Sequence, residues 1–350
     1  MAATATGIYH RSYRGDLALR HTRAEHARLV LLVALLVAMP FVLSPFWLTV
    51  ACQIGIAAVG AIGLNILVGY TGQISLGQGG FLAVGAYTSA IVVERLGLPT
   101  PVGIAVAVVV TALVGGFFGL PALRLKGLYL AIATLASQVI ILHLVRNWDL
   151  ITGGVDALVV GRPELLGYQV RSNFVWYWVI LAFATVAALA ATNLFRTGLG
   201  RAFVAIRDQD IAAEVTGIDV VRYKLLAFAV SSGFVGLAGA LTAHWTGIVT
   251  WERFTLDVSI LYLAMIIVGG LGSVAGSVYG AVFMIVLPAL IQQLGTSLRG
   301  SLPLLTQQLP AIQLGVFGLV IVLFLIFEPR GLARLWQRAK DYVRLWPFRY

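Results

Sequence analysis

Long apolar runs separated by short polar segments make up most of the chain. Seven runs contain no Asp, Glu, Lys or Arg, and about 20 apolar residues span the hydrocarbon core of a bilayer as a helix. Leu29–Val93 is long enough for three crossings and Val258–Leu298 for two. The runs that fit one crossing each are Leu96–Leu123, Gly127–Val145, Ser172–Phe195, Leu225–Trp251 and Gly300–Phe327. The pattern predicts an all-α polytopic membrane protein with about ten transmembrane helices over residues 29–327.

Basic residues gather on one side of this predicted topology. An even number of crossings places both termini on the same side of the membrane. The segments 1–28, 123–126, 193–224 and 328–350 then carry 18 of the 24 Lys and Arg residues. Cytoplasmic loops are enriched in Lys and Arg. We therefore expect residues 1–28 to form a cytoplasmic arm and residues 328–350 a basic cytoplasmic tail.

The longest charged interruption between apolar runs is Asn193–Lys224. Small apolar residues recur there at helical spacing among charged ones, which predicts one or two short helices with an apolar side, ending before Gly217. We interpret the segment as a docking surface for a cytoplasmic partner; a solvated linker is the alternative. The candidate docking residues are Arg201, Arg207, Ile211, Ala212, Ala213, Glu214 and Gly217.

A glycine-rich polar segment, Gly69–Tyr87, falls inside sequence that otherwise spans the bilayer. A helix broken at membrane depth is tolerated where protein or a water-filled cavity satisfies its freed backbone groups. The segment is therefore expected in the protein interior or along the transport path. Hydrogen bonds to neighbouring helices are an equally good interpretation of its polar side chains. The candidate path residues are Asn65, Gln73, Ser75 and Gln78.

A second glycine-rich segment carries Gly272, Gly276 and Gly280 at four-residue spacing. This spacing predicts a smooth stripe on one helix face, against which another helix packs closely.

Composition excludes several classes of protein. The chain is 60% hydrophobic and only 11% charged, against about 25% charged in soluble domains, so a soluble globule is excluded. The net charge of +10 lies in loops and tails, which favours an orientation signal over nucleic-acid binding. A single cysteine, Cys52, excludes an intrachain disulfide framework. The sequence has no GxxxxGK[ST] motif, catalytic triad or metal-ligand spacing, so we expect no enzymatic site, no ATPase site of its own and no bound cofactor or metal.

Several separated motifs together resemble one family. GLNILVGYTGQISLGQGGFLAVGAY begins at Gly63, GRAFVAIRDQDIAAEVTGIDVVRYKLLAF begins at Gly200, and FEPRGL ends at Leu332. With the glycine stripe between them, they resemble the LivM-type permeases of bacterial branched-chain amino acid ABC importers. The resemblance runs from about Gly63 to Leu332.

The resemblance implies an ABC importer permease fold in the bacterial plasma membrane, surrounded by lipid and working by alternating access. It implies a second, LivH-like permease, two cytoplasmic ATPase subunits that use ATP and magnesium, and an extracytoplasmic binding protein. It also implies that residues matching the family's EAAxxxG loop contact the ATPases. Here Ala212, Ala213 and Gly217 match that loop, whereas Ile211 replaces its glutamate.

The substrate implied by the resemblance is a branched-chain amino acid, with other amino acids, amides or urea as alternatives. An ion-coupled secondary transporter is a different class, and it usually carries intramembrane Asp, Glu or Lys residues. The seven apolar runs contain none, which favours the ABC importer.

Overall fold

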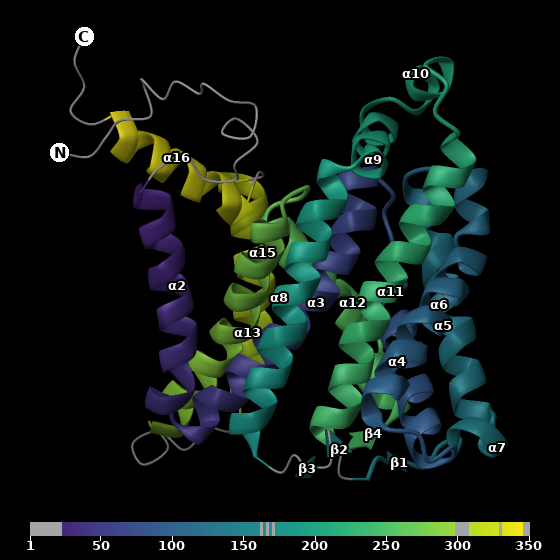
Figure 1. Cartoon of the computed structure of the whole chain (residues 1–350), viewed down its shortest axis with the longest axis vertical. Helices are drawn as coiled ribbons and strands as arrows, with labels where there is room; N and C mark the ends of the chain where they lie inside the picture. Colours follow the sequence, from purple (N-terminus) through teal and green to yellow (C-terminus); the bar gives the residue numbers. More distant parts are fainter. Residues whose placement is uncertain are drawn as a thin grey trace.

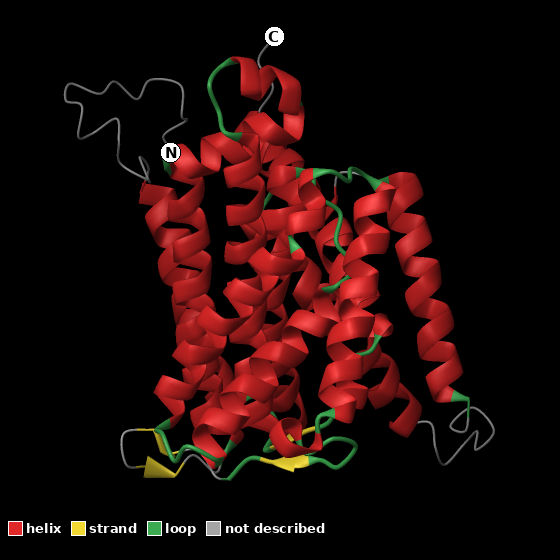
Figure 2. Ribbon diagram, turned by 90° about the vertical axis from the view of Figure 1, so that its right-hand side faces the viewer, coloured by secondary structure: helices red, strands yellow, loops and turns green. Residues whose placement is uncertain are grey.

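The computed structural model describes residues 23–161, 164–165, 168–169, 172–297, 308–328 and 331–345, and most of these are helical (Figure 2). The helices, in chain order, are α2 (Arg23–Val42), α3 (Pro45–Thr71), α4 (Gln78–Glu94), α5 (Thr100–Phe118), α6 (Leu128–Asn147), α7 (Asp149–Thr152), α8 (Asn173–Arg196), α9 (Gly198–Asp208), α10 (Asp210–Val215), α11 (Val220–Thr246), α12 (Leu256–Gly269), α13 (Val274–Ser297), α15 (Leu309–Phe327) and α16 (Gly331–Leu345). Two 3-10 turns are η1 (Leu120–Leu123) and η2 (Trp251–Phe254).

Helices occupy each of the apolar runs. Within the described residues, six are long and apolar enough to cross a membrane, namely α3, α5, α6, α8, α11 and α13. At 1.5 Å per residue, α4 with 17 residues and α12 with 14 are only about 25 and 21 Å long, shorter than the roughly 30 Å hydrocarbon core. The described apolar parts of α2 and α15 are also short. The structure thus supports a multi-pass membrane protein, and the number of ten crossings stays a prediction.

Polar elements lie at the two ends of the helix bundle (Figure 1). One end carries α9, α10, α16 and the start of α2. The other carries α7 and two short antiparallel pairs. In the first pair β1 (Leu158–Val159) meets β4 (Ile248–Val249), and in the second β2 (Glu164–Leu165) meets β3 (Tyr168–Gln169).

Both predicted terminal segments are partly helical. Helix α2 begins at Arg23, six residues before the expected start of the first crossing, and the rest of the predicted arm lies outside the described residues. In the predicted tail, α16 is an amphipathic helix that lies across the end of the bundle, whereas residues 329–330 and 346–350 lie outside the described residues (Figure 1). The apolar side of α16 covers one end of a groove of about 750 Å³ along α13.

The core forms where α11 packs against α3, α4 and α5. Glycine allows α4 and α11 to approach at backbone distance. A Cβ atom added at Gly85 would overlap the Gly236 backbone, and one added at Gly239 would overlap the Leu82 carbonyl oxygen. Dispersion contacts and close backbone packing, rather than large side chains alone, therefore hold this helix pair.

The predicted glycine stripe is wrong at Gly272. Helix α13 begins only at Val274, and Gly272 lies in the preceding turn with a φ of 72°, a left-handed conformation that glycine adopts without strain. Gly276 and Gly280 do lie on α13 and face the backbone of α12 at Gly269. The close approach thus joins α12 to α13, the two helices on either side of the turn.

The close packing of α13 on α12 predicts that Gly280→Ala lowers stability. The added methyl group would overlap the Met265 carbonyl oxygen, and such overpacking typically costs about 1–3 kcal/mol. Gly315→Ala on α15 is the matched control, because a Cβ atom there meets nothing within 4 Å among the described residues. The free energies of unfolding of the purified subunits should differ accordingly; equal values would contradict the close α12–α13 contact.

The basic asymmetry predicts that the end carrying α10 faces the cytoplasm. Val215 in α10 and Val159 in β1 are 84% and 65% exposed, whereas the native Cys52 is fully buried and provides an unreactive background. In spheroplasts, a membrane-impermeant maleimide should label Val159→Cys but label Val215→Cys only after lysis. The opposite pattern would reverse the topology.

Candidate functional site

The chain between α3 and α4 crosses the interior in a non-helical conformation. Gly72, with a φ of 69°, ends α3, and α4 begins at Gln78. The Leu76 amide donates to Thr134 Oγ1 of α6 over 2.9 Å, and the Gly79 amide donates to Ser259 Oγ of α12 over 2.8 Å. Side chains of two other helices therefore satisfy backbone groups that no helix partner can reach.

All four candidate path residues are buried. Gln78 Nε2 donates to the Gly60 carbonyl over 3.0 Å, and Ser75 Oγ accepts from the Gly77 amide over 3.3 Å. The Gln78 bond agrees with the alternative interpretation, in which the polar side chains bond to neighbouring helices, whereas the Ser75 bond stays within its own segment. Gln73 differs: its Nε2 donates to Thr71 Oγ1 over 3.0 Å, but its Oε1 has no hydrogen-bond partner among the described residues.

Asn65 bonds to the turn between α12 and α13 through both ends of its amide. Its Nδ2 donates to the Ser273 carbonyl over 2.9 Å and to Ser277 Oγ over 2.7 Å. Its Oδ1 accepts from the Gly272 amide over 2.9 Å. One side chain on α3 thus satisfies the freed backbone of a second break, far away in the sequence.

Arg207, at the end of α9, joins the docking segment to both breaks. Its Nη1 donates to the Gly69 carbonyl over 3.1 Å, and its Nε and Nη2 donate to Asp208 Oδ1 over 3.0 and 2.9 Å. A Cβ atom at Gly69 would overlap the Gly272 amide nitrogen, so the last turn of α3 touches the second break at this glycine. Beside it, Tyr70 stacks on Phe195 with ring centroids 3.4 Å apart.

Helices α9 and α10 form the short helical pair that the docking segment predicts. The apolar side of α9 is buried through Ala202, Phe203 and Ile206. Gln209, in extended conformation, separates α9 from α10. After α10, Gly217 has a φ of 89°, as expected of a residue that follows a helix end.

The exposed side of α10 differs from the predicted docking set. Ala213 is only 4% exposed, so it packs inward and does not face a partner. Ile211 and Val215 are 66% and 84% exposed, and Ala212, Glu214 and Gly217 are exposed as well. Arg201 is exposed, and its Nη1 donates to the Arg196 carbonyl within the same segment over 3.3 Å. Val215 is a candidate contact residue that the sequence interpretation missed.

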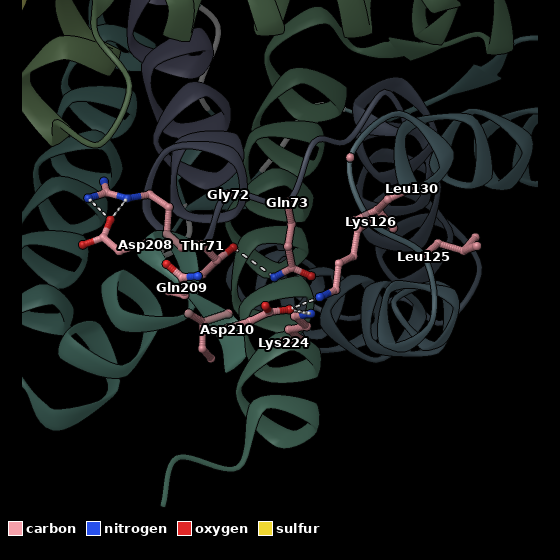
Figure 3. A pocket seen from close by; sticks show the side chains of 13 residues that line it. Thr71, Gly72, Gln73, Leu125, Lys126, Leu130, Asp208, Gln209, Asp210 and Lys224 are labelled. Atoms are coloured by element: carbon pink, nitrogen blue, oxygen red, sulfur yellow. Dashed lines mark hydrogen bonds and ion pairs between the residues drawn. The ribbon is translucent and has the colours of Figure 1, made fainter. Parts of the chain in front are cut away.

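Asp210, the first residue of α10, forms ion pairs with two lysines. Lys126 Nζ lies 2.5 Å and Lys224 Nζ 3.4 Å from Asp210 Oδ2. The hydrogen bond from Lys126 is the main reason why the pKa of Asp210 lies below its ordinary value. These residues line a cavity of about 330 Å³ between the docking segment and the first break (Figure 3). The sequence had placed 123–126 and 193–224 on one side, but did not indicate this contact.

Partly buried helix breaks, long apolar helices and a polar helical segment that contacts both breaks define a polytopic helical membrane protein of the transporter class. Residues 46–325 match the family model described as "Branched-chain amino acid transport system / permease component". The chain therefore belongs to this family of transport permeases. Membership also supports the interpretation as a transport subunit rather than an enzyme.

Curated relatives agree with this assignment. The chain is 32% identical to the high-affinity branched-chain amino acid transport system permease protein LivM of Salmonella typhimurium, and equally to that of Escherichia coli, over 87% of this chain and 74% of each relative. It is 26% identical to the probable branched-chain amino acid transport permease protein LivH of Methanocaldococcus jannaschii, over 80% of this chain and 89% of the relative. No solved structure matches significantly.

The bonds of Asn65 predict that Asn65→Leu is destabilising. Leucine has a similar size but leaves the Gly272 amide without its acceptor, and an unsatisfied buried group typically costs about 1–3 kcal/mol. The Ser273 carbonyl keeps its bond from the Ser277 amide. Gln53→Leu is the matched control, because Gln53 is an exposed amide on the same helix. Thermal unfolding of the two purified variants tests this difference. A stable Asn65→Leu subunit would mean that the second break does not need Asn65.

Proposed function

We propose that this chain is one permease subunit of an ABC importer that moves branched-chain amino acids into the cytoplasm by alternating access. Its partners would be a second, LivH-like permease, two cytoplasmic ATPase subunits that bind ATP and magnesium, and an extracytoplasmic binding protein. Membership of the branched-chain permease family and the names of the LivM and LivH relatives support this assembly. Both termini and α10 would lie on the cytoplasmic side.

The observation that carries the proposal is the contact between α9 and the two helix breaks. Ile211 and Val215 offer a partner an apolar surface outside the long apolar helices. Behind that surface, Arg207 bonds to Gly69, which touches the turn that Asn65 holds. Movement of an attached ATPase would therefore reach the interior of the permease through hydrogen bonds and packed backbone.

The side chains of the membrane domain suit an aliphatic zwitterion rather than a charged solute. Within the described residues, the apolar helices α3, α5 and α13 carry no Asp, Glu, Lys or Arg. The family description and the relatives favour branched-chain amino acids. Other amino acids, amides or urea are the alternative solutes, and uptake by the reconstituted complex distinguishes them.

The exposed apolar surface of α10 predicts that Ile211→Asp and Val215→Asp uncouple the ATPases. A carboxylate there would have to be desolvated at an apolar contact, so docking should weaken while the subunit folds normally. The measurements are co-purification of the ATPase subunits and substrate-stimulated ATP hydrolysis in proteoliposomes. Both should fall by about tenfold or more, as for the loss of an interface anchor worth 2 kcal/mol.

Val155→Asp is the matched control, because Val155 is an exposed valine between α7 and β1, which lie at the opposite end of the bundle from α10 (Figure 1). It should leave ATPase docking unchanged, although it can alter the response to the binding protein. If Ile211→Asp and Val215→Asp transport and hydrolyse ATP as the unmodified complex does, α9 and α10 form only a linker.

A further inference from the structure

The cavity beside Asp210 is lined by segments from four parts of the chain. They are the end of α3 with Gln73, the turn from η1 to α6, the junction of α9 and α10, and the first turn of α11 (Figure 3). At about 330 Å³, the cavity has the size of a site for a small molecule. It lies next to the docking segment, on the side of the membrane that we assign to the cytoplasm.

Its charges are unbalanced. Arg207 and Asp208 pair with each other, which leaves two lysines around the single carboxylate of Asp210. The Lys224 side chain is only 9% exposed, so its ammonium group has lost most of its contact with water. A second carboxylate would relieve the repulsion between the two ammonium groups.

The same cavity holds an unused acceptor. Gln73 is 5% exposed, and its Oε1 has no hydrogen-bond partner among the described residues. Figure 3 shows its amide group on the side of the cavity where the ammonium ends of Lys126 and Lys224 lie. A buried acceptor without a partner favours a ligand that brings a donor.

Part of the remaining wall is apolar. Leu130 and Ile206 are buried and line the cavity together with Leu125. An excess positive charge, a free acceptor and an aliphatic wall, all within one small cavity, correspond to the three parts of an aliphatic amino acid.

We propose that this cavity is a feedback site for a free aliphatic amino acid on the cytoplasmic side. The ligand carboxylate binds Lys126 and Lys224, its ammonium group donates to Gln73 Oε1, and its side chain packs on Leu130 and Ile206. The identity of the ligand as the transported solute rests on the proposed function. The site itself rests on the cavity, its charges and the free acceptor.

Binding there would change the docking surface. The ligand carboxylate shares with Asp210 the two lysines that hold the first residue of α10. Weaker ion pairs at Asp210 would let α10 shift and would weaken its contact with the ATPase. Accumulated amino acid would thus slow its own import.

The test uses proteoliposomes that contain the whole complex, with ATP in the lumen and loaded binding protein outside. Each preparation is compared with itself, with and without leucine in the lumen. Lumenal leucine should slow uptake and ATP hydrolysis by the unmodified complex about fivefold or more, within the usual range of allosteric coupling. Lys126→Met and Gln73→Leu should remove most of that inhibition. Lys340→Met on α16 is the matched control, because Lys340 does not line the cavity, and it should keep the full inhibition.

Two analogues test the chemistry of the ligand. 4-Methylpentanoate keeps the carboxylate and the aliphatic chain of leucine but lacks the ammonium group, and inorganic phosphate supplies only negative charge. Both should inhibit less than leucine, because Gln73 Oε1 stays without a donor. Equal inhibition by either would overturn the zwitterion site in favour of a general anion site.

The feedback proposal is wrong if lumenal leucine does not inhibit the unmodified complex, or if it inhibits Lys126→Met as strongly as the unmodified complex. Neither result would contradict the proposed import function. If the complex imports no leucine, the proposed substrate is wrong. In that case, equilibrium dialysis of radiolabelled leucine against the purified complex tests the binding site separately from transport. Binding that is lost in Lys126→Met and kept in Lys340→Met supports the site, and any other result overturns it.

Discussion

A helix that ends inside a membrane domain leaves backbone N–H and C=O groups without water, and this chain meets that requirement at two breaks. At the first break, hydroxyl groups of Thr134 and Ser259 accept from the freed amides. At the second, the Asn65 amide bonds to donors and acceptors of the turn before α13. Every one of these partners comes from a helix distant in sequence. Neither break can therefore be satisfied until α3, α6, α12 and α13 have packed together.

The end of α3 and the second break also constrain each other, because they touch at Gly69. Its carbonyl accepts from Arg207, and the absence of a side chain leaves room for the Gly272 amide. A displacement of α9 must either break the bond from Arg207 to Gly69 or carry the end of α3 with it. In the second case the turn that Asn65 bonds to is displaced as well. These bonds and contacts form a continuous physical route for the proposed coupling between α9 and the membrane domain. The route is short because Gly69, which has no side chain, lets the backbones of α3 and the second break touch.

Local properties of the sequence predicted much of this arrangement. The apolar runs gave the positions of the long helices, and the polar glycine-rich segment after α3 gave a break that is buried. The four-residue spacing of Gly272, Gly276 and Gly280 predicted one helix through all three glycines, which is wrong at Gly272. The spacing does not define where a helix starts, and α13 starts at Val274. The sequence also could not predict that Ala213 packs inward. Helix α10 has only six residues, and its apolar positions do not define one side. The contact of Asp210 with Lys126 depends on how the start of α10 packs against the turn between η1 and α6, which no local pattern contains.

The two ends of the bundle differ in the kind of bond that joins their loops. At the end with α7, backbone hydrogen bonds between β1 and β4 tie the loop after α7 to the segment after α11. A backbone ladder has one register, and its partners cannot be exchanged for solvent or ligand without loss of the pairing. At the end with α10, side-chain ion pairs join the loops, and Asp210 shares two lysines in a partly open cavity. The pair with Lys126, whose side chain is 66% exposed, can exchange partners at low cost when a competing charge arrives. The physical character of the bonds therefore places the adjustable end at α10, where Ile211 and Val215 are exposed, and the fixed end at the β pairs.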